Sequence, residues 1–116
     1  MAFDQIYNSS QRISHPDICE NMYTIDQRGN VYNLLEEAYI SWNYKKYPYV
    51  NLVNKNRDGL VSVYIKDLMA FSYLANTEDY LERGQKIVNI DGDYSNCNIH
   101  NIILIDSNEE NTKNSN

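Results

Sequence analysis

The sequence has few of the residues that build metal or disulfide frameworks. Its two cysteines, Cys19 and Cys97, stand far apart and form no Cys-x-x-Cys pair. A structural zinc site needs more ligands than these two, and a disulfide framework needs several cysteines in a secreted chain. We therefore expect two free thiols and no bound metal or cofactor.

Long apolar runs are also missing. No stretch approaches the roughly 18 apolar residues of a membrane-spanning helix. A secretion signal has a basic N-terminal region followed by a long apolar segment, and residues 1–15 do not show this pattern. These absences argue against a membrane protein and favour a cytoplasmic one.

Positive charge is scarce. Ten Lys and Arg residues face sixteen Asp and Glu residues, so the formal net charge is −6. This balance argues against a general phosphate-binding role, because such a role relies on Lys and Arg to displace counterions. A local basic stretch interrupts the acidic background, and it comprises Lys45, Lys46, Lys55 and Arg57. Its simplest interpretation is a solvated surface.

Tyrosine is the abundant aromatic residue, with eleven tyrosines against two phenylalanines. Each buried tyrosine brings a hydroxyl that needs water or a hydrogen-bond partner. This predicts a shallow core in which the tyrosine rings are buried and their hydroxyl groups reach the surface. A chain of 116 residues forms one domain. We expect a loosely attached arm at 1–20, a single domain at 21–106 and a polar, disordered tail at 107–116.

Turn residues separate several β-prone segments. Residues 22–25 and 31–34 flank a glycine-containing turn and predict one hairpin. Residues 47–53 and 60–64 predict a second hairpin, in which Pro48, Val50 and Leu52 share one face. The segment 36–44 is ambiguous, and we predict a loop or one helical turn.

The period of the apolar residues then changes. Between positions 65 and 74 the following residues recur at helical spacing: Ile65, Leu68, Met69, Ser72 and Tyr73. This pattern predicts an amphipathic helix of about three turns. A short helical turn is expected at 78–83, followed by strands at 86–90 and 102–105. The predicted fold class is α+β, with small antiparallel hairpins and one helix.

Four segments, in this order, resemble the phage and intron-type HNH homing-endonuclease family. They are residues 23–34 (YTIDQRGNVYNL), 47–52 (YPYVNL), 65–73 (IKDLMAFSY) and 88–105 (VNIDGDYSNCNIHNIILI). The first two segments resemble the β module of the family, and the third resembles its helix. The last segment resembles the HNH sequence signature. The resemblance implies a degenerate HNH, ββα-like C-terminal part, and a phage or mobile-element protein in the host cytoplasm.

The same resemblance implies a hydrolytic site that this sequence does not complete. In the family, a histidine before Ile-Asp-Gly takes a proton from water beside one divalent metal. Asn89 stands in its place or, if the histidine is deleted, as its preceding neighbour, and Val88 comes before it. An amide has no basic lone pair near neutral pH, and valine has no donor atom. The family's later metal-ligand position, after the last strand, corresponds to Glu110, or to Asn111 if the match is shifted by one residue. Lys66 stands where the family has a histidine in the helix.

Residues that shape the family's loop are retained. Asp91 and Gly92 can make a tight turn, and the amides of Asn96 and Asn101 can tie loop backbone. We interpret these positions as structural. Retention of a metal-ligand site is the alternative.

Two histidines require a separate interpretation. His100 follows the loop and His15 precedes a proline, and we expect both to be incidental. The alternative is that His100 serves as a relocated base, which requires Asp91, Asp93 or Glu110 within metal reach.

One aromatic and basic cluster is a candidate binding site, and it comprises Trp42, Tyr44, Lys45, Lys46, Tyr47 and Tyr49. In a nucleic-acid reader, aromatic rings stack on bases while lysines meet phosphates. In a protein interface, Trp and Tyr serve as anchors. A tyrosine-rich sheet face with solvated lysines is the structural alternative.

These observations favour a catalytically inactive HNH-like module without a cofactor. Its acidity favours a protein partner, either a nucleic-acid enzyme or a phage assembly, because a DNA-mimicking acidic surface can occupy a basic groove. Two alternatives stay open. One is an active metal-dependent nuclease with a rearranged site, and the other is an accessory DNA-binding module.

Overall fold

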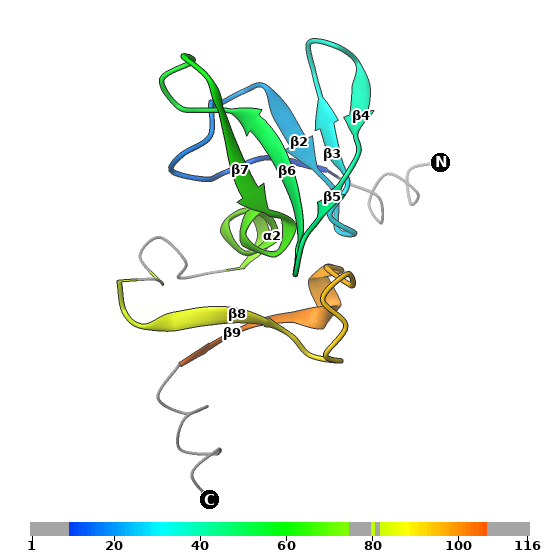
Figure 1. The fold of residues 1–116 in the computed structure, drawn as a ribbon, viewed down its shortest axis with the longest axis vertical. Coiled ribbons are helices and arrows are strands. Elements are labelled where there is room, and N and C mark those ends of the chain that lie inside the picture. The colour runs from blue at the N-terminus through cyan, green and yellow to red at the C-terminus, as the bar shows by residue number, and fades with distance from the viewer. Residues whose placement is uncertain (1–9, 75–79, 81, 107–116) are drawn as a thin grey trace, which may run out of the picture.

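A computed structural model of the chain describes residues 10–74, 80 and 82–106 (Figure 1). These residues form two antiparallel sheets, one α-helix and a two-stranded hairpin. The first sheet contains β1 (Gln11–Arg12), β2 (Tyr23–Ile25), β3 (Val31–Asn33) and β4 (Ala38–Ile40), in that order. The second contains β5 (Asn43–Tyr44), β6 (Pro48–Val53) and β7 (Leu60–Tyr64). Helix α2 (Ile65–Tyr73) follows β7, and β8 (Gln85–Asn89) pairs with β9 (Ile102–Asp106) after the 3-10 turn η1 (Ile99–Asn101).

The β2–β3 hairpin forms where the sequence predicts it. Ile25 and Val31 are register partners, and both are fully buried. The turn between them is closed by Asp26, whose carboxylate accepts hydrogen bonds from the backbone N–H groups of Arg28 at 2.9 Å and Asn30 at 3.0 Å. The hydrogen bonds of the turn and the burial of two β-branched residues therefore both stabilise the β2–β3 hairpin.

The prediction of a loop or one helical turn for residues 36–44 is wrong. In this segment β4 pairs with β3 and β5 pairs with β6, so it supplies an edge strand to each sheet. The turn before β4 begins at Asn33, whose side-chain oxygen accepts hydrogen bonds from the backbone N–H groups of Leu35 and Glu36. Short edge strands leave a weak signal in a sequence, because their stability comes from pairing with other strands rather than from local preference.

The second sheet and the helix supply the centre of the core. Pro48, Val50 and Leu52 are buried on one face of β6, whereas Asn51 is exposed, as the alternation predicts. Helix α2 ends within one residue of the predicted boundary. Its buried residues are Ile65, Leu68, Met69 and Ala70.

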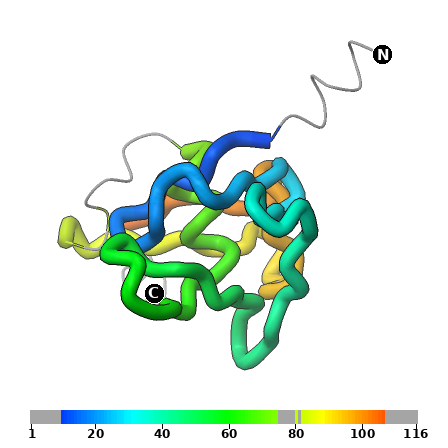
Figure 2. The backbone as a smooth tube through the Cα atoms, turned by 90° about the horizontal axis from the view of Figure 1, so that it is seen from above, coloured from blue at the N-terminus to red at the C-terminus, as the bar shows by residue number. Residues whose placement is uncertain are grey.

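Residues 10–20 are attached more firmly than the expected arm. β1 pairs with β2, and Ile13 and Ile18 are buried in the core. Ile18 also forms a β-bridge with Asn54, so this segment lies beside the turn between β6 and β7 (Figure 2). Burial of two isoleucines outweighs the polar character that predicts a loose arm. Residues 1–9 of the expected arm lie outside the described residues.

The β8–β9 hairpin lies below α2 in Figure 1 and shares one core with the two sheets. Ile87, Cys97 and Ile102 belong to the same buried cluster as the sheet residues. The hairpin agrees with the strands predicted at 86–90 and 102–105. The predicted tail at 107–116 lies outside the described residues, as do residues 78, 79 and 81 of the helical turn predicted at 78–83. Within the part of the chain that is described, no helix has both the length and the apolar character needed to cross a lipid bilayer.

Candidate functional site

The end of β8 and the loop that follows it carry the positions at which the family resemblance implies catalysis. The loop turns at Gly92, whose N–H donates to the carbonyl of Asn89 at 3.0 Å. The φ of Gly92 is +77°, in the left-handed region that glycine adopts without steric cost. The chain then returns to β9, and the N–H of Ile90 donates to the carbonyl of Asn101 at 2.7 Å. The loop is therefore closed at its base by backbone hydrogen bonds.

The carboxylate of Asp91 fastens this loop. It accepts hydrogen bonds from the backbone N–H of Asp93 at 2.8 Å and from the side-chain amides of Asn96 and Asn101, both at 2.9 Å. The hydrogen bond from Asn96, with those from Asp93 and Asn101, holds the pKa of Asp91 below its ordinary value. The carboxylate oxygens thus have partners within the loop itself.

Asn89 is also part of the loop's internal structure. It is 9% exposed, and its side-chain amide donates to the backbone carbonyl of Asn96 at 2.9 Å. The amide of Asn101 donates to the same carbonyl at 2.8 Å. Val88, one residue earlier, pairs across the hairpin with Ile103 and has no polar side-chain atom. The two positions that would hold a base and its neighbour therefore shape the hairpin.

Other side chains that could act as a base or a ligand have different environments. Cys97 is 1% exposed, and burial raises its pKa to about 11, so it stays a neutral thiol at physiological pH. His100 is exposed on η1, where its backbone N–H donates to the side chain of Asn98. His15 lies on another part of the molecule, with its ring edge-on to Phe71 at 4.8 Å, and burial lowers its pKa.

A divalent metal, which the resemblance implies, does not fit the donor set of this loop. Asn89 and Val88 offer an amide already in use and an aliphatic side chain, and the Asp91 carboxylate already accepts three hydrogen bonds. Across residues 10–74, 80 and 82–106, no group of three or more His, Cys, Asp or Glu side chains could hold a metal ion. Glu110, the predicted later ligand position, lies outside the described residues.

Two residues of the predicted aromatic and basic cluster form a unit of their own. The indole Nε1 of Trp42 donates to the carbonyl of Gly29 at 3.0 Å, which fixes the ring against the first sheet. Tyr44 is 62% exposed, and its ring centroid lies 6.3 Å from that of Trp42. Trp42 thus has a structural role at the turn of the β2–β3 hairpin.

The rest of the cluster joins residues from other elements in what we call the tyrosine–lysine face, which comprises Lys45, Lys46, Tyr47, Tyr49, Tyr64, Lys66 and Tyr94. Tyr47 stands at its centre, with its ring centroid 4.5 Å from that of Tyr94 and 5.3 Å from that of Tyr64. The Nζ of Lys46 lies 5.6 Å from the Tyr47 ring centroid, within cation–π range. The face therefore unites the β5–β6 turn, β6, β7, α2 and the β8–β9 loop.

Lys66 connects this face to the C-terminal hairpin. Its Nζ lies 3.7 Å from the Tyr47 ring centroid and donates to the carbonyl of Ile87 at 3.3 Å. Burial lowers the pKa of Lys66, because the ammonium loses water there. Lys45 and Lys46 are exposed instead, and no carboxylate in the described part of the chain forms an ion pair with either.

A hollow of about 240 Å³ opens in the face and is lined by Lys45, Tyr49, Ser62 and Tyr64. Tyr49 and Tyr64 are register partners on β6 and β7. The sequence analysis did not include Tyr64, Lys66 or Tyr94 in the cluster. The register of the predicted hairpin could have indicated Tyr64, whereas Lys66 and Tyr94 arrive only through tertiary packing.

Comparison with known proteins identifies the fold. No family model matches the sequence, and no curated protein matches it. Among solved structures, the chain is similar to the HNH homing endonuclease I-HmuI, studied for its DNA binding and cleavage, with a TM-score of 0.73 and 19% sequence identity. The match covers 91% of this chain and 56% of that one, so the chain spans little more than half the length of the endonuclease. The predicted resemblance is confirmed as an HNH-type endonuclease fold.

Proposed function

We propose that this chain, which has an HNH-type endonuclease fold, binds nucleic acid without cutting it. One observation carries the proposal: Asn89, at the position of the catalytic imidazole in the resemblance, is buried and donates its side-chain amide to the carbonyl of Asn96. A carboxamide cannot take the proton from an attacking water near neutral pH. The loop therefore offers a scaffold and no general base at this position.

The tyrosine–lysine face supports the binding half of the proposal. Exposed tyrosine rings are surfaces on which bases can stack, and lysine ammonium groups meet backbone phosphates. Tyr64 and Tyr94 are 42% and 43% exposed. Lys45 and Lys46 are exposed as well, without a carboxylate partner among the described residues. On a chain with a net charge of −6, this local positive charge favours phosphate contact here over most of the surface.

Cleavage and binding can be tested on the same samples. Supercoiled plasmid incubated with the protein and magnesium or manganese should stay intact, while a labelled oligonucleotide should bind with an affinity that falls as salt rises. Tyr94→Ala should weaken this binding by about 1 to 3 kcal/mol, because it removes one stacking surface. Tyr39→Ala is the matched control, since it removes a 70% exposed tyrosine from the first sheet, and it should leave the affinity unchanged.

Two outcomes would overturn parts of this proposal. Metal-dependent nicking that His100→Ala abolishes would support the alternative of an active nuclease with a rearranged site. Oligonucleotide binding that is absent, or that Tyr39→Ala and Tyr94→Ala weaken equally, would remove the tyrosine–lysine face from the proposal. The melting temperature of each variant is measured as well, so that weaker binding can be distinguished from loss of the fold.

A protein partner is the second candidate, and a different surface supports it. Leu35 and Tyr39 are 76% and 70% exposed in the β3–β4 hairpin, next to Glu36 and Glu37. An apolar and acidic surface of this kind fits a basic protein groove, such as that of a nucleic-acid enzyme. A partner lost with Leu35→Ser but retained with Tyr94→Ala would favour this candidate. A phage or mobile-element origin stays a prediction from the resemblance.

A further inference from the structure

We propose that the tyrosine–lysine face takes single-stranded rather than duplex nucleic acid, with one unpaired base held in the hollow on the solvent side of β6 and β7. This inference rests on the proposed function, because it names the kind of nucleic acid that the face binds. Aromatic rings and a hydrogen-bonded polar pair stand next to each other on this exposed sheet surface. A base offers both its ring faces and its pairing edge only when it is unpaired and unstacked.

Strand register brings these side chains to one surface. Tyr49 of β6 pairs with Tyr64 of β7. Two positions along each strand, Asn51 pairs with Ser62. Residues two apart on a strand point to the same face, so the four side chains share one side of the sheet. Val50, between the two positions on β6, is fully buried, so the shared side is the one that faces solvent.

The hollow on this surface suits a single base. It measures about 240 Å³ and is lined by Lys45, Tyr49, Ser62 and Tyr64. Pockets for drug-sized ligands measure about 300 to 1,000 Å³, so this one is too small for a larger ligand. The Nζ of Lys45 lies 6.0 Å from the Tyr49 ring centroid. A base that stacks on a tyrosine here can thus direct its own phosphate toward a lysine.

Asn51 and Ser62 add a polar contact at this place. The Oγ of Ser62 donates to the Oδ1 of Asn51 at 2.5 Å, which fixes the orientation of the amide. The Asn51 side chain is exposed, and its Nδ2 has no partner among residues 10–74, 80 and 82–106. This nitrogen can donate to an acceptor on the edge of a base. In a duplex that edge is occupied by base pairing.

Tyr64 and Tyr94 extend the stacking surface beyond the hollow. Both rings contact Tyr47, with centroid distances of 5.3 Å and 4.5 Å. Tyr47 itself is covered on one side by Lys66, whose Nζ lies 3.7 Å from its ring centroid. Tyr47 thus supports the two outer rings, which remain exposed. Successive bases stacked on aromatic side chains are the usual means of binding a single strand.

The charge of the face also favours a single strand. Duplex DNA carries one negative charge per about 1.7 Å of its axis, and its binding depends on many phosphate contacts. Lys45 and Lys46 are the exposed lysines of the face, whereas Lys66 is engaged with Tyr47 and the carbonyl of Ile87. Two lysines on a chain with a net charge of −6 attract a duplex weakly. Stacking adds affinity that does not depend on charge.

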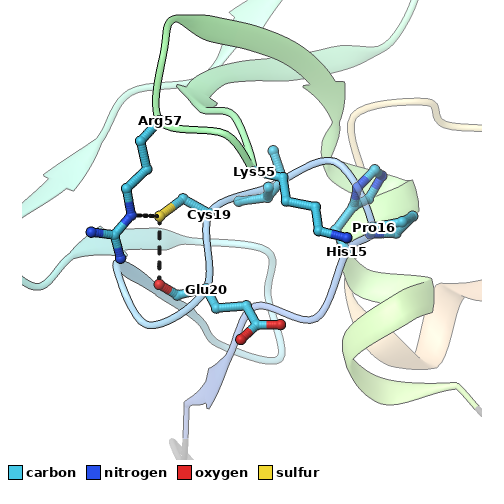
Figure 3. Close-up of a pocket in the computed structure, with 7 residues that line it drawn as sticks. His15, Pro16, Cys19, Glu20, Lys55 and Arg57 are labelled. Atoms are coloured by element: carbon cyan, nitrogen blue, oxygen red, sulfur yellow. Dashed lines mark hydrogen bonds between the residues drawn. The ribbon is translucent and has the colours of Figure 1, made fainter.

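The basic residues beside the β6–β7 turn do not provide a comparable surface. Lys55, Arg57 and His15 line another hollow, of about 320 Å³. Figure 3 shows the Arg57 guanidinium on the far side of Cys19 from the other two, and its Nε donates to the Cys19 Sγ at 3.1 Å. Glu20 also lines this hollow and adds a negative charge. These cations therefore do not converge on one phosphate.

Competition between a single strand and its own duplex tests the inference on the full chain. A labelled oligonucleotide of about 12 nucleotides, which is within the usual site size, should bind about tenfold or more tightly than the duplex that it forms with its complement. Both are measured at the same salt concentration. The same sequence made as DNA and as RNA shows which kind of strand the face prefers.

Tyr64→Ala should weaken binding of the single strand by about fivefold or more, because it removes one stacking surface. It should not weaken the lower affinity for an oligonucleotide without bases, which keeps its phosphates but has nothing to stack. Leu60→Ala is the matched control, since it removes a 68% exposed side chain from the same face of β7, and it should change neither affinity.

The outcomes separate this inference from the proposed function. Duplex binding that equals or exceeds single-strand binding overturns the inference and leaves the proposed function standing, whereas binding of neither ligand overturns both. Equal weakening of the normal and the base-free oligonucleotide by Tyr64→Ala also overturns the inference, because the ring then does not act by stacking. If Tyr64→Ala lowers the melting temperature strongly, Tyr94→Ala in the β8–β9 loop supplies the same comparison.

Discussion

Side-chain amides hold the β8–β9 loop together at the residue scale. Asn89 and Asn101 donate to one carbonyl, that of Asn96, and the amides of Asn96 and Asn101 also donate to the carboxylate of Asp91. An amide donates and accepts without changing its charge near neutral pH. These three amides therefore preserve the shape of the loop but cannot act as a general base near neutral pH. Asp91 is the titratable residue of this hydrogen-bonded set.

Acid should weaken the folded protein in part through Asp91. Its pKa in the folded protein lies below the ordinary value of 3.8, so its stabilising effect is complete above about pH 3.8 and is lost as pH falls through the lower folded-state value. We expect Asp91→Asn to reduce the drop in melting temperature between about pH 7 and about pH 3. Glu37→Gln, in the exposed turn before β4, is the control and should keep the full drop. An equal drop in both variants would contradict this role for Asp91.

At the element scale, the β2–β3 turn has to fit closely against helix α2. Gly29 has a φ of +91°, and a Cβ added there would lie 2.7 Å from Cγ2 of Ile65 and 3.1 Å from Cζ2 of Trp42. Its carbonyl also accepts the hydrogen bond from the Trp42 indole. The absence of a side chain at this position lets the first sheet, the helix and the tryptophan come together.

Gly29→Ala should therefore destabilise the protein strongly. The left-handed backbone costs about 1 to 2 kcal/mol for a residue with a Cβ, and the steric conflict with Ile65 adds about 1 to 3 kcal/mol. Gly84→Ala is the matched control, since Gly84 has a φ of +73° but a Cβ there would meet nothing within 4 Å. Urea unfolding should show a free energy loss for Gly29→Ala that clearly exceeds the loss for Gly84→Ala. Equal losses would mean that the contact with Ile65 relaxes without cost.

The whole molecule is organised around one core that both sheets, the helix and the C-terminal hairpin share. Ile87 of β8 is 2% exposed and belongs to the same cluster as Ile25 of β2 and Val50 of β6. Lys66 adds a polar link, because it contacts Tyr47 and the carbonyl of Ile87. A core shared in this way predicts one cooperative unfolding transition.

Ile87→Ala should lower the stability of the entire molecule. The lost side-chain burial and the cavity together cost about 2 to 5 kcal/mol. Trp42 fluorescence, which reports on the first sheet, and far-UV circular dichroism should shift to the same lower urea midpoint. Ile103→Ala, at a position 45% exposed on the partner strand, should shift it far less. Two separate transitions would show that the hairpin unfolds independently of the sheets.

Sequence patterns alone predicted the elements whose signals are local. The alternation in 47–53 and the helical spacing in 65–74 depend on neighbours within a few positions, so both appear in the chain before it folds. The consequence of an amide at Asn89 is likewise a property of that group, whichever fold surrounds it. The resemblance to the HNH family rests on such short segments in their order.

Tertiary structure alone decided which distant side chains meet. It paired the edge strands of 36–44, buried Ile18 of the expected arm, brought Lys66 and Tyr94 to Tyr47, and fixed residues 15–19 against the β6–β7 turn. Neither local preference nor spacing encodes these contacts, because each depends on how segments far apart in the chain pack around a common core. The loop residues and the segment from Lys45 to Tyr49 could thus be named from the sequence, whereas Lys66 and Tyr94 join the tyrosine–lysine face only in the fold.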